Sequence, residues 1–434
     1  MTKEEAKLKV CQAIDARAGE ITEIADTIFQ HPELGYKEFK TAELVAKKLQ
    51  EMGLSYQDKI GITGIKANLT GRSSEVRIGV MGELDSVLCP NHPHADPMTG
   101  AAHSCGHHGQ IAAMLGVAMG LVDAGMMSEL GGDVSLMAVP AEEYVEIEYR
   151  NELRRQGKIK FLGGKQEFIA LGALDDIDLC MMMHLGGGDG AEVGNSSNGF
   201  VGKFIEYKGK EAHAGGAPHD GVNALNAAML GLMGIHAQRE TFKDSDHIRI
   251  HPIINKGGDL VNIIPADVRM ETYVRGKSLD AIMDASRKTN RALKAGALAV
   301  GAEVEITEIP GYLPQVPDRS MDELFKANME SLIGDDKVQW GGHGTGSTDM
   351  GDVTQIMPAI QPFVGGCGGH FHSYDFHMVD THLAYVQSAK AMAMTVIDLL
   401  WDDAKLAKEI KANFKPTFTK QSYLEMWEKL FTEE

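Results

Sequence analysis

Apolar and polar positions follow two different patterns along the 434-residue chain, and the first of them covers residues 1–198. In this part, short apolar runs of strand length alternate with longer stretches in which apolar residues recur at helical spacing. Two of the runs, VRIGVMGELDSV and DVSLMAVPAEE, end in acidic residues. Alternating strands and helices predict an α/β domain with a mixed, mostly parallel sheet and helices on both faces. The carboxyl ends of its strands are the usual place for a ligand site.

The same pattern predicts the individual elements of this part. Residues 1–30 are predicted to form one helix, and a second helix is predicted to have Thr41 as its N-cap and to stop at Gly53. The charged segment that follows VPAEE is predicted to be an exposed excursion that returns as a helix. Strands are predicted at four places: 64–70, 76–84, 133–139 and the run LCMMMHL, which ends near His184.

The second pattern begins near Gly199, where the order becomes strand, helix, strand, strand, helix, strand up to residue 310. This order is that of a ferredoxin-like α+β unit, which folds as a compact domain. Apolar strands, glycine turns and a closing helix at 379–401 resume beyond Gly311. We therefore predict a catalytic domain in two parts, 1–198 and 311–434, with an inserted lid or dimerisation domain at 199–310.

Composition narrows the class of protein. A formal net charge of −19 argues against a nucleic-acid partner, which needs basic surface, although it does not exclude an anionic small substrate. No run of eighteen apolar residues occurs, and the first residues lack an apolar core of signal-peptide length, so no membrane partner is expected. Five widely spaced cysteines, an odd number, are expected to be reduced thiols. The sequence predicts a cytoplasmic protein.

A candidate metal site lies in the string HSCGHHGQ, residues 103–110. Cys105 and His107 are separated by one residue in a glycine-containing loop, so both side chains can reach one ion. The pair alone is equally compatible with a buried structural cysteine beside a surface histidine. Asp85, near the end of the preceding apolar run, is a candidate for orienting a metal-bound histidine by hydrogen bonding.

Glu142 and Glu143 follow Pro140 at the end of a predicted strand. Adjacent side chains on extended backbone point in opposite directions, so one glutamate can bind metal while the other faces a substrate. Such a pair suits metal-assisted hydrolysis, in which a carboxylate moves a proton from water to the leaving amine. His184 is also compatible with ordinary burial. Of the three histidines in the loop GGHFHSYDFHMVD, at least one is expected to have no structural role.

Nine strings in order resemble the aminoacylase/carboxypeptidase family of co-catalytic metallopeptidases from about residue 30 to 400. They are HPELGY, GELD, HSCGHH, VPAEE, MMMHL, GKEAHAGGAPHDGVNAL, LVNIIPADVRMETYVRG, GSTDMGDV and HSYDF. The Cys-Gly-His loop is similar to the amidohydrolase branch that contains indole-acetyl-amino-acid hydrolase and aminobenzoyl-glutamate hydrolase, and GSTDMGDV resembles the latter.

The resemblance implies two divalent ions per chain, Zn²⁺ or Mn²⁺. It implies that the metal ligands are Cys105, His107, Glu143, His184 and His372. Glu142 would be the general base and acid, and Asp85 would lie behind the metal site. His213 would reach across a homodimer, formed through the inserted domain, to stabilise the oxyanion in the partner's site. Asn262 and, more weakly, Arg275 would contact the substrate; Arg275 is equally compatible with a surface strand arginine.

Two residues depart from the pattern of this branch. His108 stands where Asp or Asn is usual, and Gln110 stands where many members carry histidine. An imidazole at position 108 could add a ligand or remove a supporting carboxylate. The predicted function is hydrolysis of the amide bond of N-acyl or N-aroyl amino acids by metal-activated water. The alternatives are a dipeptidase, a hydrolytic deaminase of an arylamine and a catalytically silent binding protein that keeps the fold; no predicted ligand is missing, which disfavours the last.

Overall fold

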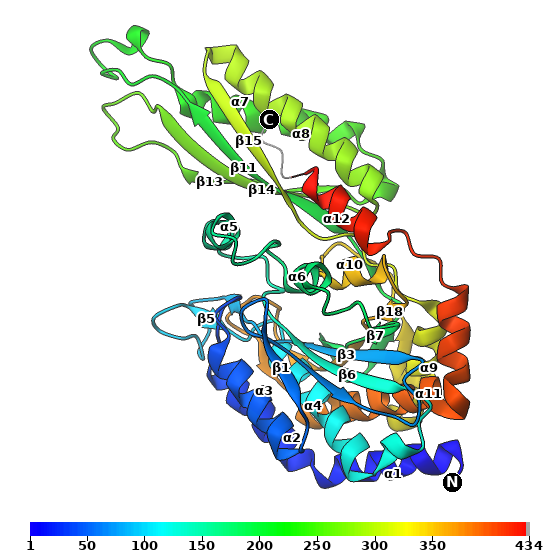
Figure 1. Cartoon of the computed structure of the whole chain (residues 1–434). Coiled ribbons are helices and arrows are strands. Elements are labelled where there is room, and N and C mark those ends of the chain that lie inside the picture. The colour runs from blue at the N-terminus through cyan, green and yellow to red at the C-terminus, as the bar shows by residue number, and fades with distance from the viewer. Residues whose placement is uncertain (431–434) are drawn as a thin grey trace. The chain divides into compact units, whose positions relative to one another are not determined.

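The computed structural model describes residues 1–430 and divides the chain into two compact units (Figure 1). The first unit is formed by Met1–Ser196, Val316–Gly342 and Asp352–Lys420. The second contains Ser197–Gln315, together with His343–Gly351 and residues 421–430. The second unit therefore interrupts the first along the chain.

A six-stranded sheet forms the centre of the first unit, in the order β1-β2-β6-β3-β7-β18. Its strands are β1 (Tyr56–Ile60), β2 (Gly64–Leu69), β3 (Arg77–Glu83), β6 (Asp133–Val139), β7 (Leu179–Met181) and β18 (Ala359–Ile360). The pairs β6-β3, β3-β7 and β7-β18 are parallel, whereas β1-β2 and β2-β6 are antiparallel. The carboxyl ends of β3, β6 and β7 therefore meet at one edge of the sheet.

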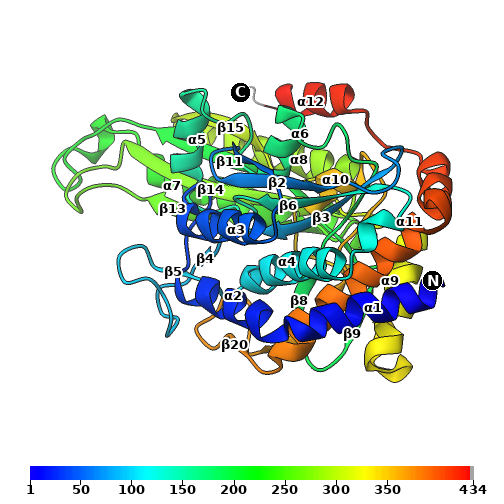
Figure 2. The same ribbon diagram turned by 60° about the horizontal axis from the view of Figure 1, so that its bottom comes forward.

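Helices cover both faces of this sheet. Figure 2 shows α1 (Lys3–Ala16), α2 (Ala18–Gln30), α4 (His107–Asp123) and α11 (Ser388–Asn413) packed together on one side. The short α6 (Gly164–Leu171) packs against β6 on the other side. The helix from His382 to Asn413 is long and apolar enough to cross a membrane, but 94% of its most apolar window is buried inside this unit. This burial is that of a core helix, so its length and apolar composition need no membrane to explain them.

The remaining elements of the first unit surround this core. The helices are α3 (Phe39–Glu51), α5 (Ile147–Arg155) and α9 (Arg319–Ile333). The strands are β4 (Val87–Leu88), β5 (Ala101–Ala102), β8 (His184–Gly187), β9 (Ala191–Val193), β16 (Val338–Trp340), β19 (Phe363–Gly368) and β20 (His377–Met378). Three short elements, β10 (Ser196–Ser197), α10 (Met350–Thr354) and α12 (Lys420–Glu428), lie where the chain passes between the units.

The second unit has the predicted β-α-β-β-α-β order. Its main sheet runs β12-β14-β11-β15, and β13 also pairs with β14. The elements are β11 (Gly199–Lys208), α7 (Ala224–Gln238), β12 (Arg249–Ile250), β13 (Ile253–Lys256), β14 (Asp267–Gly276), α8 (Leu279–Val300) and β15 (Glu303–Pro310). The predicted architecture, an α/β domain with a mixed sheet and helices on both faces and an inserted ferredoxin-like domain, is confirmed. The short β17 (His343–Gly344) belongs to this unit as well.

Four local predictions are wrong. The strand predicted to end near His184 stops at Met181, and His184 begins β8. Residues 1–30 form two helices, which are separated at Arg17. Thr41 does not cap α3, because Glu38 precedes the helix and the carboxylate of Glu33 accepts hydrogen bonds from the N–H groups of Lys40 and Thr41. The segment after VPAEE is not simply an exposed excursion, since residues 161–169 are buried.

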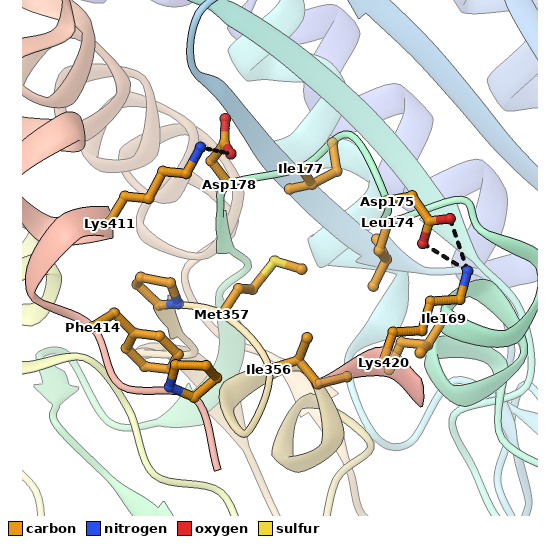
Figure 3. Close-up of a pocket in the computed structure, with 12 residues that line it drawn as sticks. Ile169, Leu174, Asp175, Ile177, Asp178, Ile356, Met357, Lys411, Phe414 and Lys420 are labelled. Atoms are coloured by element: carbon orange, nitrogen blue, oxygen red, sulfur yellow. Dashed lines mark hydrogen bonds and ion pairs between the residues drawn. The ribbon is translucent and has the colours of Figure 1, made fainter. Parts of the chain in front are cut away.

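A cavity of about 360 Å³ lies at the amino ends of the parallel strands (Figure 3). Asp178 and Pro358, which line it, directly precede β7 and β18. Lys411 and Lys420 also line it and form ion pairs with Asp178 and Asp175 at 2.6 and 2.7 Å. The cavity is therefore at the sheet edge opposite to the one where the predicted metal ligands gather.

Candidate metal centre

The loop between β5 and α4 turns sharply at Gly106, which has a φ of 90°. A side chain at this position would be strained, and a Cβ atom would lie 2.8 Å from Cβ of Leu185. The turn places Cys105 immediately before the first helical residue, His107, and both are buried. The glycine thus lets the chain bring a thiol and an imidazole to the same edge of the sheet.

Asp85 fixes the ring of His107. Nδ1 of His107 lies 2.9 Å from the carbonyl oxygen of Asp85 and 3.2 Å from its Oδ1. The other carboxylate oxygen, Oδ2, accepts a hydrogen bond from the backbone N–H of Glu143 at 2.9 Å. Because Nδ1 is engaged in this way, Nε2 is the nitrogen of His107 that can bind an ion. Asp85 therefore contacts the His107 ring directly, and its role as an orienting residue stays a prediction.

The five predicted ligands lie in two groups that share Cys105. Within each group, candidate ligand atoms lie no more than 4.8 Å apart. One group consists of Cys105, His107 and His184, and the other of Cys105, Glu143 and His372. His372 comes from the second half of the unit, where its backbone N–H donates to the carbonyl oxygen of Ser104 at 2.8 Å. A shared thiolate between two ligand groups suits a bridged pair of ions.

Charges within these groups favour the thiolate of Cys105 and the carboxylate of Glu143. At the three imidazoles, burial lowers the pKa but the neighbouring anions outweigh it and raise the pKa, so an ion that binds there displaces protons. Burial and Glu143 raise the pKa of the Cys105 thiol, but His107 and His184 more than offset them and lower it to about 6. Burial also raises the pKa of Glu143, whereas His372 more than offsets it and lowers it to about 2. Thiolate, imidazole and carboxylate are the donors that Zn²⁺ and similar ions take.

Two buried ligand atoms also lack the hydrogen bonds that buried polar atoms normally have. Among residues 1–430, no hydrogen-bond partner of ordinary geometry meets Nε2 of His107 or Oε1 of Glu143. Oε1 of Glu143 is nevertheless only 3.0 Å from Nε2 of His372. Two ligand atoms that approach closely without bonding to each other are arranged to bind a third partner, so these residues fit divalent ions.

Glu142 lies beside the groups, with its Oε2 3.7 Å from Nε2 of His107. The preceding residue, Ala141, has a φ of 56°, which is unusual for a residue other than glycine. The buried carboxylate of Glu38 accepts the Ala141 N–H at 2.8 Å and so stabilises this turn. The strained turn directs the consecutive glutamates differently, which leaves Glu143 with His372 and Glu142 near His107.

The two departures from the family pattern have different surroundings. His108 is buried and its Nε2 lies 3.1 Å from the hydroxyl of Tyr385, so it is in neither ligand group. Burial lowers the pKa of His108 to about 3, and it is a neutral core side chain. Gln110 instead faces the candidate centre, where its Nε2 donates to Oε2 of Glu83 at 2.8 Å.

The remaining predicted site residues lie in the second unit. His213 is exposed, and its Nδ1 accepts hydrogen bonds from the N–H groups of Gly215 and Gly216 at 3.2 and 2.9 Å. The neutral ring therefore carries its proton on Nε2, which can donate to an oxyanion. Asn262 is exposed on the neighbouring segment. Its backbone carbonyl oxygen accepts a hydrogen bond from the backbone N–H of Ala214. Arg275 contacts Ser347 and the rings of Phe200 and Tyr273.

Several residues of the centre were not among the predicted site residues. Glu38 stabilises the turn before Glu142, and no pattern in the sequence marks it. Lys165 is fully buried and pairs with Glu83, yet it lies in the segment that the sequence predicts to be exposed. Glu83 has a signal, because it ends an apolar run next to Asp85, and Gln110 has one as a departure from the family pattern.

Residues 195–299 match the model of a peptidase dimerisation domain. The chain is 27% identical to Xaa-Arg dipeptidase of Mus musculus, over 94% of this chain and 92% of that protein. It is 24% identical to IAA-amino acid hydrolase ILR1-like 4 of Arabidopsis thaliana, over 78% of this chain and 75% of the relative.

Solved structures share the fold. An aminobenzoyl-glutamate utilization protein from Klebsiella pneumoniae superposes with a TM-score of 0.68 at 18% identity, covering 91% of this chain and 99% of its own. The Bacillus subtilis YXEP protein, described as a dinuclear metal binding peptidase from the M20 family, has a TM-score of 0.66 at 20% identity, covering 89% and 99%.

With its fold, its match to a peptidase dimerisation domain and these relatives, the chain is a metal-dependent hydrolase of the peptidase and amidohydrolase class. Within that class, the predicted resemblance to the aminoacylase/carboxypeptidase metallopeptidases and their amidohydrolase branch is confirmed.

Proposed function

We propose that this chain hydrolyses the amide bond of N-acyl or N-aroyl amino acids with two divalent ions, Zn²⁺ or Mn²⁺, at the centre around Cys105. The observation that carries the proposal is the pair of ligand groups that share Cys105, with Glu142 beside them. The names of the amidohydrolase relatives support an acylated amino acid as substrate. The predicted cytoplasmic location is part of the same proposal.

The chain's own residues divide the work as follows. When bound, the ions lower the pKa of water and polarise a carbonyl group. Asp85 holds the ring of His107 so that Nε2 faces the ion site. Glu142 accepts a proton from the attacking water and delivers it to the amine that leaves. Asn262 and Arg275 contact the substrate, and Arg275 takes its carboxylate.

A homodimer completes the site in this proposal. The Nε2–H of His213 in one subunit donates to the oxyanion in its partner's site, as its hydrogen-bonded Nδ1 allows. The second unit carries exposed apolar side chains that suit an interface: Met229, Leu230 and Met233 on α7 and Ile253 and Ile254 on β13. The match to a peptidase dimerisation domain supports the same assembly.

The decisive experiment compares Glu142→Gln with the parent enzyme. Products are identified by mass spectrometry after incubation with acyl- and aroyl-amino acids in the presence of Mn²⁺ or Zn²⁺. We expect turnover to fall by at least about 10²-fold while bound metal is unchanged, because the amide cannot accept the proton. Glu148→Gln, which changes an exposed glutamate of the nearby α5, is the matched control and should keep full activity. Undiminished turnover by Glu142→Gln would contradict the mechanism.

A second candidate, a dipeptidase, is favoured by one observation. Similarity to Xaa-Arg dipeptidase extends over 94% of this chain and 92% of that protein. The same residues would act on a peptide bond, since only the group on the acyl side differs. Adding dipeptides with a C-terminal arginine to the substrate panel distinguishes the two functions by the products released.

A further inference from the structure

Glu83 is a fully buried carboxylate at the end of β3, next to the candidate centre. Its Oε1 forms an ion pair with Nζ of Lys165 at 2.5 Å, and its Oε2 accepts a hydrogen bond from Nε2 of Gln110 at 2.8 Å. Glu83 is therefore an anion in the interior of the first unit.

The buried ion pair between Glu83 and Lys165 is not explained by a gain in folding stability. A buried ion pair seldom stabilises a protein more than apolar side chains of similar volume, because both charges lose their hydration. A carboxylate has about four lone pairs for hydrogen bonds or metals, and the bonds to Lys165 and Gln110 use only two of them. At least one lone pair of Oε2 remains for another partner.

The nearest candidate partner of that lone pair is Nε2 of His107. The two atoms are 3.1 Å apart, yet Nε2 has no hydrogen bond of ordinary geometry among the described residues. Two ligands that bind one ion at about 2.0–2.2 Å are separated by roughly 3.0–3.5 Å. The distance between Glu83 and His107 thus matches that of two ligands of the same ion.

The ligand pair Glu143 and His372 has the same geometry. Its oxygen and nitrogen are 3.0 Å apart, and Oε1 of Glu143 likewise lacks a hydrogen bond of ordinary geometry. Glu83, His107 and Glu142 also form a third group whose ligand atoms lie within 4.8 Å of one another. In that group Glu142 is farther from Nε2 of His107, at 3.7 Å, which suits a proton carrier better than a ligand.

We propose that Glu83 is a further metal ligand, which binds through Oε2 the ion that His107 binds through Nε2. Lys165 and Gln110 are positioning residues that hold this carboxylate in place. An added carboxylate oxygen makes the ligand set harder, so it favours Mn²⁺ relative to Zn²⁺. The assignment rests on the proposed function only in that the Cys105 groups bind divalent ions.

The test measures binding of Mn²⁺ and Zn²⁺ to the metal-free, full-length protein by calorimetry. We expect Glu83→Gln to weaken Mn²⁺ binding by at least about tenfold and to weaken Zn²⁺ binding less, because the thiolate of Cys105 remains. Glu308→Gln is the matched control. Glu308 is also paired with a buried lysine, Lys203, and accepts a hydrogen bond from an amide, but it lies in the second unit.

A second variant guards against misfolding. Glu83→Asp keeps the charge that Lys165 needs but draws the oxygen back by one methylene, so it should also lose Mn²⁺ affinity. Parent-like Mn²⁺ affinity in a folded Glu83→Gln or Glu83→Asp protein would overturn the assignment. Failure of the parent protein to bind either ion would instead overturn the proposed function, and the assignment with it. Cobalt substitution adds a readout, since the thiolate-to-cobalt absorption should persist in Glu83→Gln and vanish in Cys105→Ser.

Discussion

Asp322 is a residue whose burial has a measurable cost. It lies in the first turn of α9, and within residues 1–430 neither of its carboxylate oxygens has a hydrogen bond of ordinary geometry. Burial raises the pKa of Asp322 to about 7, and the neighbouring Gly194 N–H offsets only part of this effect. Because the folded chain holds this proton to higher pH than the unfolded chain, stability is lost as pH rises from about 4 to about 7.

Asp322→Asn should therefore stabilise the protein at neutral and higher pH. The amide stays uncharged, so we expect an increase on the order of 2 kcal/mol in the free energy of unfolding at pH 8. The gap should close near pH 4, where the carboxyl is protonated in both states. Thermal unfolding between pH 4 and 8 measures it, with Glu323→Gln, an exposed site on the same helix, as the control. An equal gap at all pH values would contradict this explanation.

At the residue scale, the sequence identifies side chains that end strands or lie in a marked string. Cys105, His107, Glu142 and Glu143 are of this kind, and the structure brings them together. Lys165 could not be found in this way, because its partner Glu83 lies 82 positions earlier in the chain. The packing of α6 against β6 brings its segment to the sheet. Charged residues that act through long-range pairing have no local signature.

The element that most constrains the centre is the turn before α4. Gly106→Ala would put a Cβ atom at a φ of 90° and within 2.8 Å of the Leu185 side chain. We expect a loss of about 1–2 kcal/mol in the free energy of unfolding and a larger loss of metal affinity, since Cys105 and His107 flank the turn. Denaturant unfolding and calorimetry measure the two effects.

The control for this turn is a glycine with similar backbone but open surroundings. Gly125 has a φ of 59° and no atom within 4 Å of an added Cβ. Gly125→Ala should therefore cost stability through backbone strain alone and leave metal affinity unchanged. If Gly106→Ala bound metal like the parent protein, the turn would not be what positions the two ligands.

Element boundaries show where local sequence rules stop. Residues 1–30 are helical as their spacing predicts, but the helix is interrupted at Arg17, so two helices form. The start of α3 depends on the distant carboxylate of Glu33 rather than on a capping residue within the helix. His184 begins β8 instead of ending the preceding strand, which stops at Met181. In each case, a tertiary contact or a local change of backbone conformation decides the boundary. The periodicity of apolar residues does not reveal either of these.

At the scale of the whole molecule, the proposed dimer predicts complementation between two inactive variants. Glu142→Gln lacks the proton carrier, and His213→Ala lacks the oxyanion donor that serves the partner's site. In a mixed dimer, one of the two sites has both groups. Random reassociation should therefore restore about a quarter of the parent activity, since about half of the dimers are mixed.

The assay mixes the two purified variants, dissociates and reassociates them, and measures turnover. Each variant reassociated with itself is the control and should stay inactive. Absence of recovered activity in a mixture that forms mixed dimers would show that His213 acts within its own subunit or not at all.

The division into two units could be predicted because the periodicity itself changes near Gly199. The sequence could not show that His343–Gly351 and residues 421–430 join the second unit. Those segments are separated from it by long stretches of the first unit, and their own patterns do not specify a partner. The periodicity of apolar residues therefore predicts the fold of each unit. Which additional segments of the chain join each unit depends on tertiary packing.

The metal-ligand groups draw on both sides of the inserted unit, from Cys105 to His372. During synthesis, His372 is the last of the five predicted ligands to leave the ribosome, after the whole insertion has been made. Any fragment that ends before this residue lacks a full ligand set, however well its own strands and helices form. In the proposed function, metal loading would therefore wait until both parts of the first unit have been made, and hydrolytic capacity would arise only in molecules in which these two parts have joined.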